Sequence, residues 1–180
     1  MAKFFSMADN TGIAEAADQS STLQWHFHNF ERWYGSTAGV APGVQNALVP
    51  WRVTTSATAG AFGTAVLMFN GTETGLVFQN EFDFRRVQVE NVQSTDTFLL
   101  RFSFSLNDEA TAAAAVANGH YTTIVWKVDA TNNDASPLDI WCGQIPIGKK
   151  VWVEAAKKTT GAAWVDFYAG LHWYPARPGL

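Results

Sequence analysis

The sequence predicts an all-β fold, an antiparallel β-sandwich of jelly-roll type with one short helix. Short runs rich in Val, Ile, Phe and Trp recur along the chain and are separated by turn residues. Apolar and polar residues alternate within these runs, as they do in strands with one buried face. A single segment, residues 107–119, has the alanine-rich composition of a helix. Because this spacing and alternation are typical of sandwiches and barrels, we expect about eight or nine strands.

The first 45 residues differ in composition from the rest of the chain. We therefore divide the chain into an N-terminal arm and extended aromatic segment, residues 1–45, and a β-sandwich domain, residues 46–180. Residues 6–22 are small and polar, which is typical of an arm. Residues 23–34 fit both a helical and a strand period, and their aromatic content favours a strand. Phe4 and Phe5 are expected either to dock on a neighbouring subunit or to fold back onto their own domain.

The predicted strands follow one another from residue 48 onward. They are residues 48–55, 64–69, 75–78, 82–92, 97–106, 121–129, 138–145, 150–156 and 162–174. Within residues 82–92 the apolar residues change parity between Phe84 and Val87, which predicts a β-bulge at Arg85 and Arg86. Between two strands, residues 107–119 begin with acidic residues and end in Asn-Gly, so we expect a helix near residues 108–117.

Composition and charge exclude several classes of partner. Hydrophobic residues make up 47% of the chain and charged residues only 16%, below the usual share of about 25%, as in chains that hide surface against partners. The net charge of -4 argues against a nucleic-acid groove, which needs a basic surplus. No apolar stretch approaches the about 20 residues of a membrane helix. Cys142 is the single cysteine, so no intrachain disulfide is expected.

Candidate catalytic and metal-binding residues lack suitable neighbours in the sequence. His26 and His28 have the spacing of two metal ligands on one strand face, but no cysteine and only one glutamate lie close by. Cys142 has no base or orienting group near it in the sequence. Glu81 and Asp83 share strand parity, as paired carboxylates of a glycosidase would, yet adjacent arginines favour a solvated face. We therefore expect no catalytic residue, no metal site and no cofactor.

Aromatic residues are in excess and suggest a contact surface. There are 8 Trp, 13 Phe and 4 Tyr residues. In the last two predicted strands, the parity opposite to the apolar residues holds aromatic residues mixed with Lys150, Glu154 and Asp166. Such residues mark a subunit interface or a sugar-stacking platform, or else a second buried face under the N-terminal segment. The predicted interface residues are Phe4, Phe5, Trp152, Trp164, Tyr168, His172 and Tyr174.

The C-terminal half resembles a known family. The segment Gly148-Lys149-Lys150-Val151-Trp152 and the final stretch Phe167–Tyr174 are similar to a "GTKVW" step and a final "FxxGLHxY" strand. These recur in β-sandwich structural proteins of tailed bacteriophages, and the resemblance covers roughly residues 80–175. It implies a virion component, either a capsid decoration or cement protein or a tail-associated protein, without an active site.

Taken together, these features predict a non-enzymatic virion structural protein of the capsid decoration or cement type. It would be made in the bacterial host cytoplasm, become part of the virion, and act through subunit contacts. The expected partners are the protein itself, as a homo-oligomer such as a trimer, and other virion proteins such as a major capsid protein. Neither nucleic acid nor membrane is an expected partner. The alternative is a glycan- or receptor-binding β-sandwich module of a phage tail.

Overall fold

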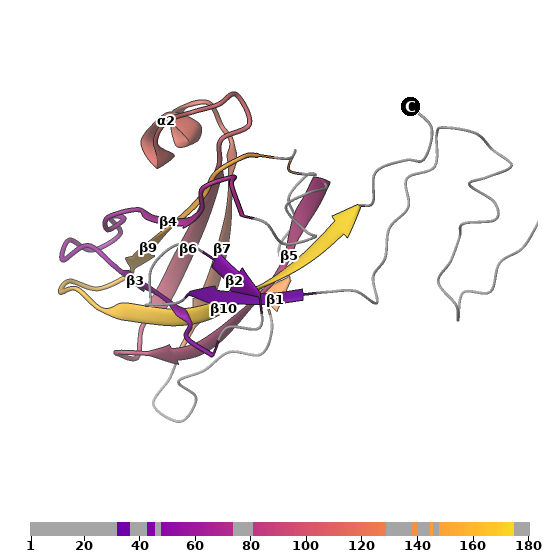
Figure 1. Ribbon diagram of the computed structural model, residues 1–180. Coiled ribbons are helices and arrows are strands. Elements are labelled where there is room, and N and C mark those ends of the chain that lie inside the picture. Colours follow the sequence, from indigo (N-terminus) through magenta and orange to yellow (C-terminus); the bar gives the residue numbers. More distant parts are fainter. Residues whose placement is uncertain are drawn as a thin grey trace, which may run out of the picture.

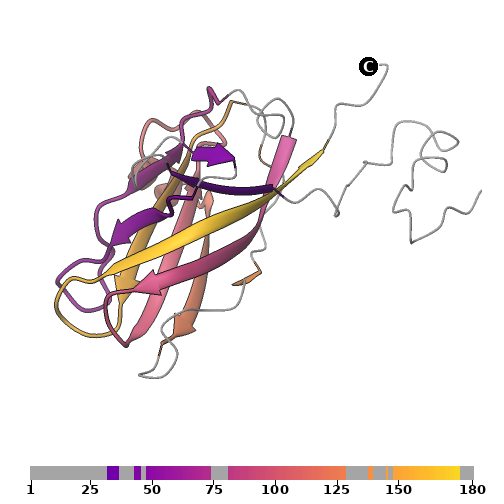
Figure 2. The ribbon, with the colours of Figure 1, turned by 60° about the horizontal axis from the view of Figure 1, so that its bottom comes forward.

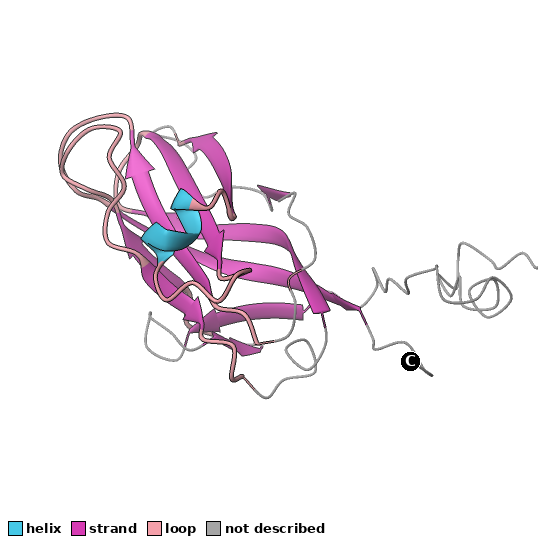
Figure 3. Cartoon of the chain, turned by 90° about the horizontal axis from the view of Figure 1, so that it is seen from above, coloured by secondary structure: helices cyan, strands magenta, loops and turns pink. Residues whose placement is uncertain are grey.

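The computed structural model describes residues 32–36, 43–45, 48–73, 81–128, 138–139, 145 and 148–174. This part of the chain forms two antiparallel sheets and one short helix (Figures 1 and 3). The prediction of an all-β fold with a single short helix is therefore confirmed for the described residues. Residues 1–31, which include most of the predicted arm, and the predicted strand at residues 75–78 lie outside them.

The larger sheet has six strands arranged around the C-terminal strand β10. In order they are β2 (Gly43–Gln45), β1 (Arg32–Ser36), β10 (Trp164–Tyr174), β5 (Glu81–Val92) and β8 (Leu138–Asp139), while β3 (Trp51–Thr54) also pairs with β10. Figure 2 shows β10, in yellow, running between β5 on one side and β1 on the other. The strands β1 and β2 lie in residues 1–45, the segment that we separated from the β-sandwich domain on the basis of the sequence. In the structure they pair into the larger sheet.

The smaller sheet has four strands. In order they are β4 (Val66–Phe69), β9 (Val151–Lys157), β6 (Thr97–Phe104) and β7 (Tyr121–Lys127). The strands β6 and β9 pair along their length, and β4 and β7 flank them. Each predicted strand within the described residues is observed; of the predicted residues 138–145, only the two residues of β8 and Ile145 belong to the described part of the chain.

Buried side chains from both sheets form one hydrophobic core. The rings of Phe84 in β5 and Phe102 in β6 lie 4.7 Å apart, and Phe102 also meets Phe167 of β10 edge-on at 5.8 Å. Trp51 of β3 stacks on Phe167 at 5.8 Å. Because aromatic rings from both sheets interdigitate, the two sheets are stabilised by the same core.

Two β-bulges keep β5 buried on one side. Its register with β10 shifts twice, and Arg85 is the extra residue at the first shift, which confirms the predicted bulge. Glu90 is the extra residue at the second shift, which was not predicted. Each inserted residue reverses which side of the strand faces inward. As a result Phe84, Val87 and Val92 all reach the core despite their different parity.

The predicted helix is confirmed as α2, Ala112–Ala117. The Thr111 side chain caps it by accepting a hydrogen bond from the Ala114 amide at 3.2 Å. The helix begins later than predicted because the Glu109 carboxylate is used in the preceding loop, where it accepts a hydrogen bond from the Asn107 amide. Among the described residues no helix has the length and apolar character needed to cross a membrane.

Candidate functional site

The side of β10 that points away from the core carries polar and aromatic residues. Along the strand Trp164, Asp166, Tyr168, Gly170 and His172 alternate with buried core residues. Opposed residues of antiparallel strands share a face, so further residues join this side from the neighbouring strands. Trp33 of β1 pairs with Gly170, and Arg52 of β3 pairs with Asp166. We call the set Trp33, Arg52, Trp164, Asp166 and Tyr168 the aromatic face.

Arg52 is the charged centre of the aromatic face. Its Nε and Nη2 donate to the two carboxylate oxygens of Asp166 at 2.8 and 2.7 Å. Its guanidinium carbon also lies 4.1 Å from the centre of the Trp164 ring. The hydrogen bond with Asp166 raises the pKa of Arg52. A bidentate ion pair and a cation–π contact together hold the guanidinium in place while 52% of the Arg52 side chain stays exposed.

Tyr168 connects the aromatic face to the segment before β3. Its hydroxyl donates a hydrogen bond to the Leu48 carbonyl oxygen at 3.0 Å. Burial, followed by the charges of Glu90 and Asp166, raises the pKa of Tyr168, so the hydroxyl keeps its proton and remains a donor. The Leu48 backbone is thereby tied to the sheet, whereas Leu48 as a whole is 93% exposed. The result is an apolar side chain presented to solvent from an anchored backbone.

Two of the predicted interface residues are buried. Trp152 belongs to β9 in the smaller sheet, is only 6% exposed, and packs with Ala112 and Ala115 of α2. The prediction that Trp152 shares a face with the aromatic residues of β10 is therefore wrong, because parity along a strand does not reveal which sheet the strand joins. His172 does lie on β10 but is 3% exposed, with Nδ1 3.7 Å from Asp83 Oδ1.

The remaining predicted interface residues divide into two groups. Trp164 and Tyr168 are half-buried and belong to the aromatic face. Tyr174 ends β10, but its side chain lies outside the described part of the chain, as do Phe4 and Phe5. The prediction that these three residues make contacts stays a prediction.

Sequence reasoning missed two residues of this region, Trp33 and Arg52, and the ion-pair partner of Asp166. Trp33 is visible as an aromatic residue but is brought beside β10 only by the β1–β10 register. Arg52 alternates with the buried Trp51 and Val53, which does signal its outward direction. No sequence signal predicts that Asp166, 114 residues away, is its partner.

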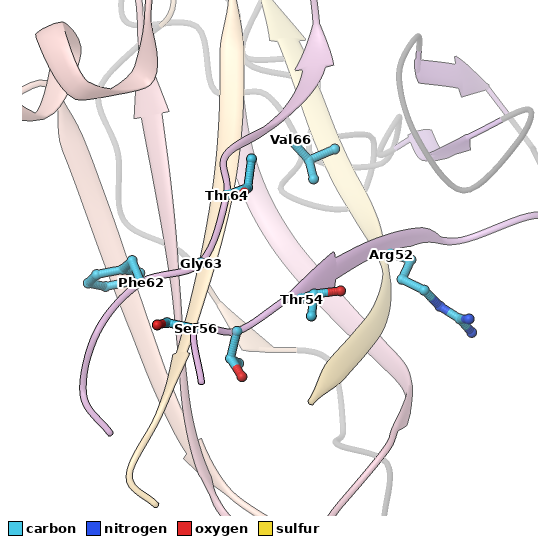
Figure 4. A pocket seen from close by; sticks show the side chains of 8 residues that line it. Arg52, Thr54, Ser56, Phe62, Gly63, Thr64 and Val66 are labelled. Atoms are coloured by element: carbon cyan, nitrogen blue, oxygen red, sulfur yellow. The ribbon is translucent and has the colours of Figure 1, made fainter. Parts of the chain in front are cut away.

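A groove of about 520 Å³ adjoins the aromatic face, between β3 and the segment leading into β4 (Figure 4). It is lined by Arg52, Thr54, Thr55, Ser56, Phe62, Gly63, Thr64 and Val66. Figure 4 shows Arg52 and Phe62 pointing in opposite directions at its two ends. Gly63 lies very close to the backbone of β3, since a Cβ added to it would lie 1.9 Å from the Thr54 carbonyl oxygen. Thr54 pairs directly with Trp164, so the groove and the aromatic face are continuous.

His120 is paired with a nearly buried carboxylate, that of Glu109. Its Nδ1 lies 2.6 Å from Glu109 Oε1, and the same oxygen accepts a hydrogen bond from Asn118 Nδ2. The Asn118 hydrogen bond, with those from backbone amides and His120, outweighs burial and lowers the pKa of Glu109 to about 2. This arrangement joins the loop before α2 to the residues after it, which is a structural role. Cys142 itself lies outside the described residues.

Asp96 forms a second nearly buried polar cluster. Its carboxylate accepts hydrogen bonds from the Thr97 and Thr159 amides and lies 3.3 Å from Lys157 Nζ. Burial acts to raise the pKa of Asp96, but hydrogen bonds from Thr159, Thr97 and Lys157 outweigh it and bring the value to about 2. The cluster ties the turn before β6 to the end of β9.

Other candidates for chemistry are dispersed in the described residues. There, no three His, Cys, Asp or Glu side chains are grouped so that they could hold a metal ion. His26 and His28 lie outside the described residues, as does the Glu81 side chain, while Asp83 lies near His172. Comparison with protein-family models, curated proteins and solved structures finds no match to this chain. Its function is therefore inferred from its own residues and geometry.

Proposed function

We propose that this chain is a non-enzymatic structural protein that acts through contacts of its aromatic face. The observation that carries the proposal is the aromatic face itself, which combines two Trp residues, Tyr168 and Arg52. Tyr168 of this face binds the backbone of Leu48, whose side chain is almost fully exposed. Trp, Tyr and Arg are the residues enriched in protein interfaces, and exposed apolar surface rimmed by polar groups marks contact sites. In a chain with only 16% charged residues, this surface suits association.

The aromatic face is also well prepared for binding. Burying Leu48 in a contact would contribute about 1.5–3 kcal/mol. The ion pair between Arg52 and Asp166 and the hydrogen bond from Tyr168 already restrain the surrounding groups. Because these groups are ordered before a partner arrives, less conformational entropy is lost on binding.

The virion assignment is part of the same proposal. It is supported by the resemblance of Gly148–Trp152 and Phe167–Tyr174 to structural proteins of tailed bacteriophages. The protein would decorate or cement a capsid, as a homo-oligomer such as a trimer, in contact with a major capsid protein. For the fold, we propose a jelly-roll-like β-sandwich, which the two antiparallel sheets and their shared core support.

Sedimentation velocity at tens of micromolar tests self-association. The wild-type chain is expected to form an oligomer, and Leu48→Asp is expected to shift it towards monomer without unfolding, because Leu48 contributes almost nothing to the core. Val125→Asp is the matched control, since Val125 is exposed on the smaller sheet. A monomeric wild type, or equal weakening by both substitutions, would contradict the proposed contact.

Particle location tests the virion role. Electron micrographs of phage particles labelled with an antibody to this chain are expected to show label on the capsid. Label confined to the tail would instead favour the alternative, a glycan- or receptor-binding module. That alternative further predicts glycan binding that is lost in Trp164→Ala while assembly is intact.

A further inference from the structure

We propose that the groove between β3 and the segment leading into β4 binds a short neutral glycan. The inference develops the alternative of a glycan-binding module and does not require self-association. It rests on the shape of the groove, its hydroxyl groups, and the Arg52, Asp166 and Trp164 cluster at its edge. Each of these features corresponds to something that sugar recognition needs.

The groove has a volume suited to a small ligand, and one of its walls is held by backbone hydrogen bonds. Its volume of about 520 Å³ falls within the range of about 300–1,000 Å³ found for small-molecule sites. The Gly63 amide donates to the Ala155 carbonyl at 2.9 Å, and the Gly60 amide donates to the Lys157 carbonyl at 2.8 Å. These bonds hold the segment against β9, so one wall of the groove is formed before any ligand binds.

Two hydroxyl groups in the groove, those of Thr54 and Thr64, are available to a ligand. These exposed side chains make no hydrogen bond within the described part of the chain. The other two hydroxyl groups are already used: that of Thr55 accepts a hydrogen bond from the Ala163 amide, and that of Ser56 accepts one from the Thr58 amide. A hydroxyl both donates and accepts, so each can pair with a sugar hydroxyl in either sense.

The edge of the groove supplies the remaining elements of a sugar site. Asp166 uses two N–H groups of Arg52, and the other N–H groups of this half-exposed guanidinium remain as donors for a sugar oxygen. Trp164 lies directly opposite Thr54 in the β3–β10 register. Side chains opposed in this way have Cβ atoms about 4.5–5.5 Å apart. An aromatic ring beside a hydroxyl allows the apolar face of a pyranose to pack while its hydroxyl groups bond.

The charge of the site favours a neutral sugar over an acidic one. Among the described residues that line the groove, Arg52 alone is charged, and Asp166 balances its charge. Glu90 acts on neighbouring Tyr168 as a further negative charge. The whole chain also carries a net charge of -4. A carboxylated, sulfated or phosphorylated sugar would find no net positive potential here.

A glycan array is the direct test. The purified full chain is applied to an array of neutral oligosaccharides of glucose, galactose and mannose, printed beside sialylated and uronic acid-containing ones. We expect binding to a subset of the neutral sugars. The inference would be overturned if none of the neutral sugars bound, or if only acidic sugars bound.

Hydroxyl deletion then locates the site. For a neutral sugar that binds, Thr54→Val and Thr64→Val are each expected to weaken affinity about five-fold, as loss of one hydrogen bond would. Thr123→Val is the matched control, because Thr123 is an exposed strand threonine on the smaller sheet. Equal affinity of all three variants and wild type would place binding elsewhere and overturn the inference.

The two proposals can fail separately. Leu48→Asp removes the self-association contact but leaves the groove lining intact, so it is expected to bind the same sugars as wild type. If the array shows no binding while Leu48→Asp still disrupts an oligomer, the glycan inference fails and the structural role remains.

Discussion

Gly63→Ala tests how closely the groove segment approaches β3. The added Cβ would lie 1.9 Å from the Thr54 carbonyl oxygen, whereas real Cβ contacts essentially never fall below 3.0 Å. The obstruction is backbone, so no side chain can rotate away. The segment must therefore move by at least about 1 Å, which weakens the hydrogen bond from the Gly63 amide to Ala155.

The expected cost follows from these contacts. Overpacking against a firm neighbour costs about 1–3 kcal/mol, and loss of one backbone hydrogen bond costs about 0.5–1.5 kcal/mol. Replacing glycine restricts the unfolded chain and offsets about 0.4–1 kcal/mol of this. We therefore expect the free energy of unfolding to fall by about 2–3 kcal/mol. At about 2–4 °C per kcal/mol for a chain of this length, the midpoint of thermal unfolding should fall by roughly 4–12 °C.

Urea denaturation measures this change, and Gly60→Ala is the comparison. Gly60 has a φ of 71° and no atom within 4 Å of an added Cβ, so its substitution tests backbone strain without a collision. Strain of that kind costs about 1–2 kcal/mol. Amide exchange at residue 63 should quicken in Gly63→Ala and stay slow in Gly60→Ala. A Gly63→Ala protein within about 0.5 kcal/mol of wild type, with unchanged exchange, would refute the close approach.

Three further predictions concern the core, the aromatic face and acid stability. Phe102→Ala should lower the free energy of unfolding by about 3–5 kcal/mol in urea, because the ring is fully buried between both sheets; a cost below about 1 kcal/mol would argue against the shared core. Tyr168→Phe should lower the free energy of unfolding by only about 0.5–1 kcal/mol, because the lost hydrogen bond to Leu48 is partly exposed. A larger decrease would contradict the exposed position of this hydrogen bond. Asp96 and Glu109 have pKa values lowered to about 2, so the stability they contribute is complete above about pH 5 and is lost as pH falls towards 2. Asp96→Asn and Glu109→Gln should each flatten the dependence of unfolding free energy on pH in that window, and an unchanged slope would count against the assigned hydrogen bonds.

Much of the secondary structure could be predicted because it depends on local patterns. Alternating side chains along residues 97–106 and 162–174 correspond to β6 and β10. The parity change after Phe84 corresponds to the bulge at Arg85, since a strand can keep one side buried across such a change only by inserting a residue. The comparable change between Val89 and Val92 carries the same signal for the second bulge. Asn-Gly after the alanine run likewise marks the end of α2.

The candidate site could be predicted only in part, because its composition depends on which strands pair. Alternation placed Trp164 and Tyr168 on the side away from the core, and the structure confirms that direction. The same alternation in β9 could not show that Trp152 lies in the other sheet, under α2.

Sequence alone therefore determined the all-β class, the strand positions, the first bulge and the outward direction of side chains on β10. Tertiary structure decided sheet membership, the contact between Arg52 and Asp166, the bond from Tyr168 to Leu48, and the groove beside them. The physical reason is the distance along the chain between the residues that interact. Strand alternation and helix ends arise from neighbours a few residues apart, whereas Tyr168 and Leu48 are 120 residues apart. Contacts of that range form because burying a shared core selects the pairing of whole strands, and no single residue encodes that choice.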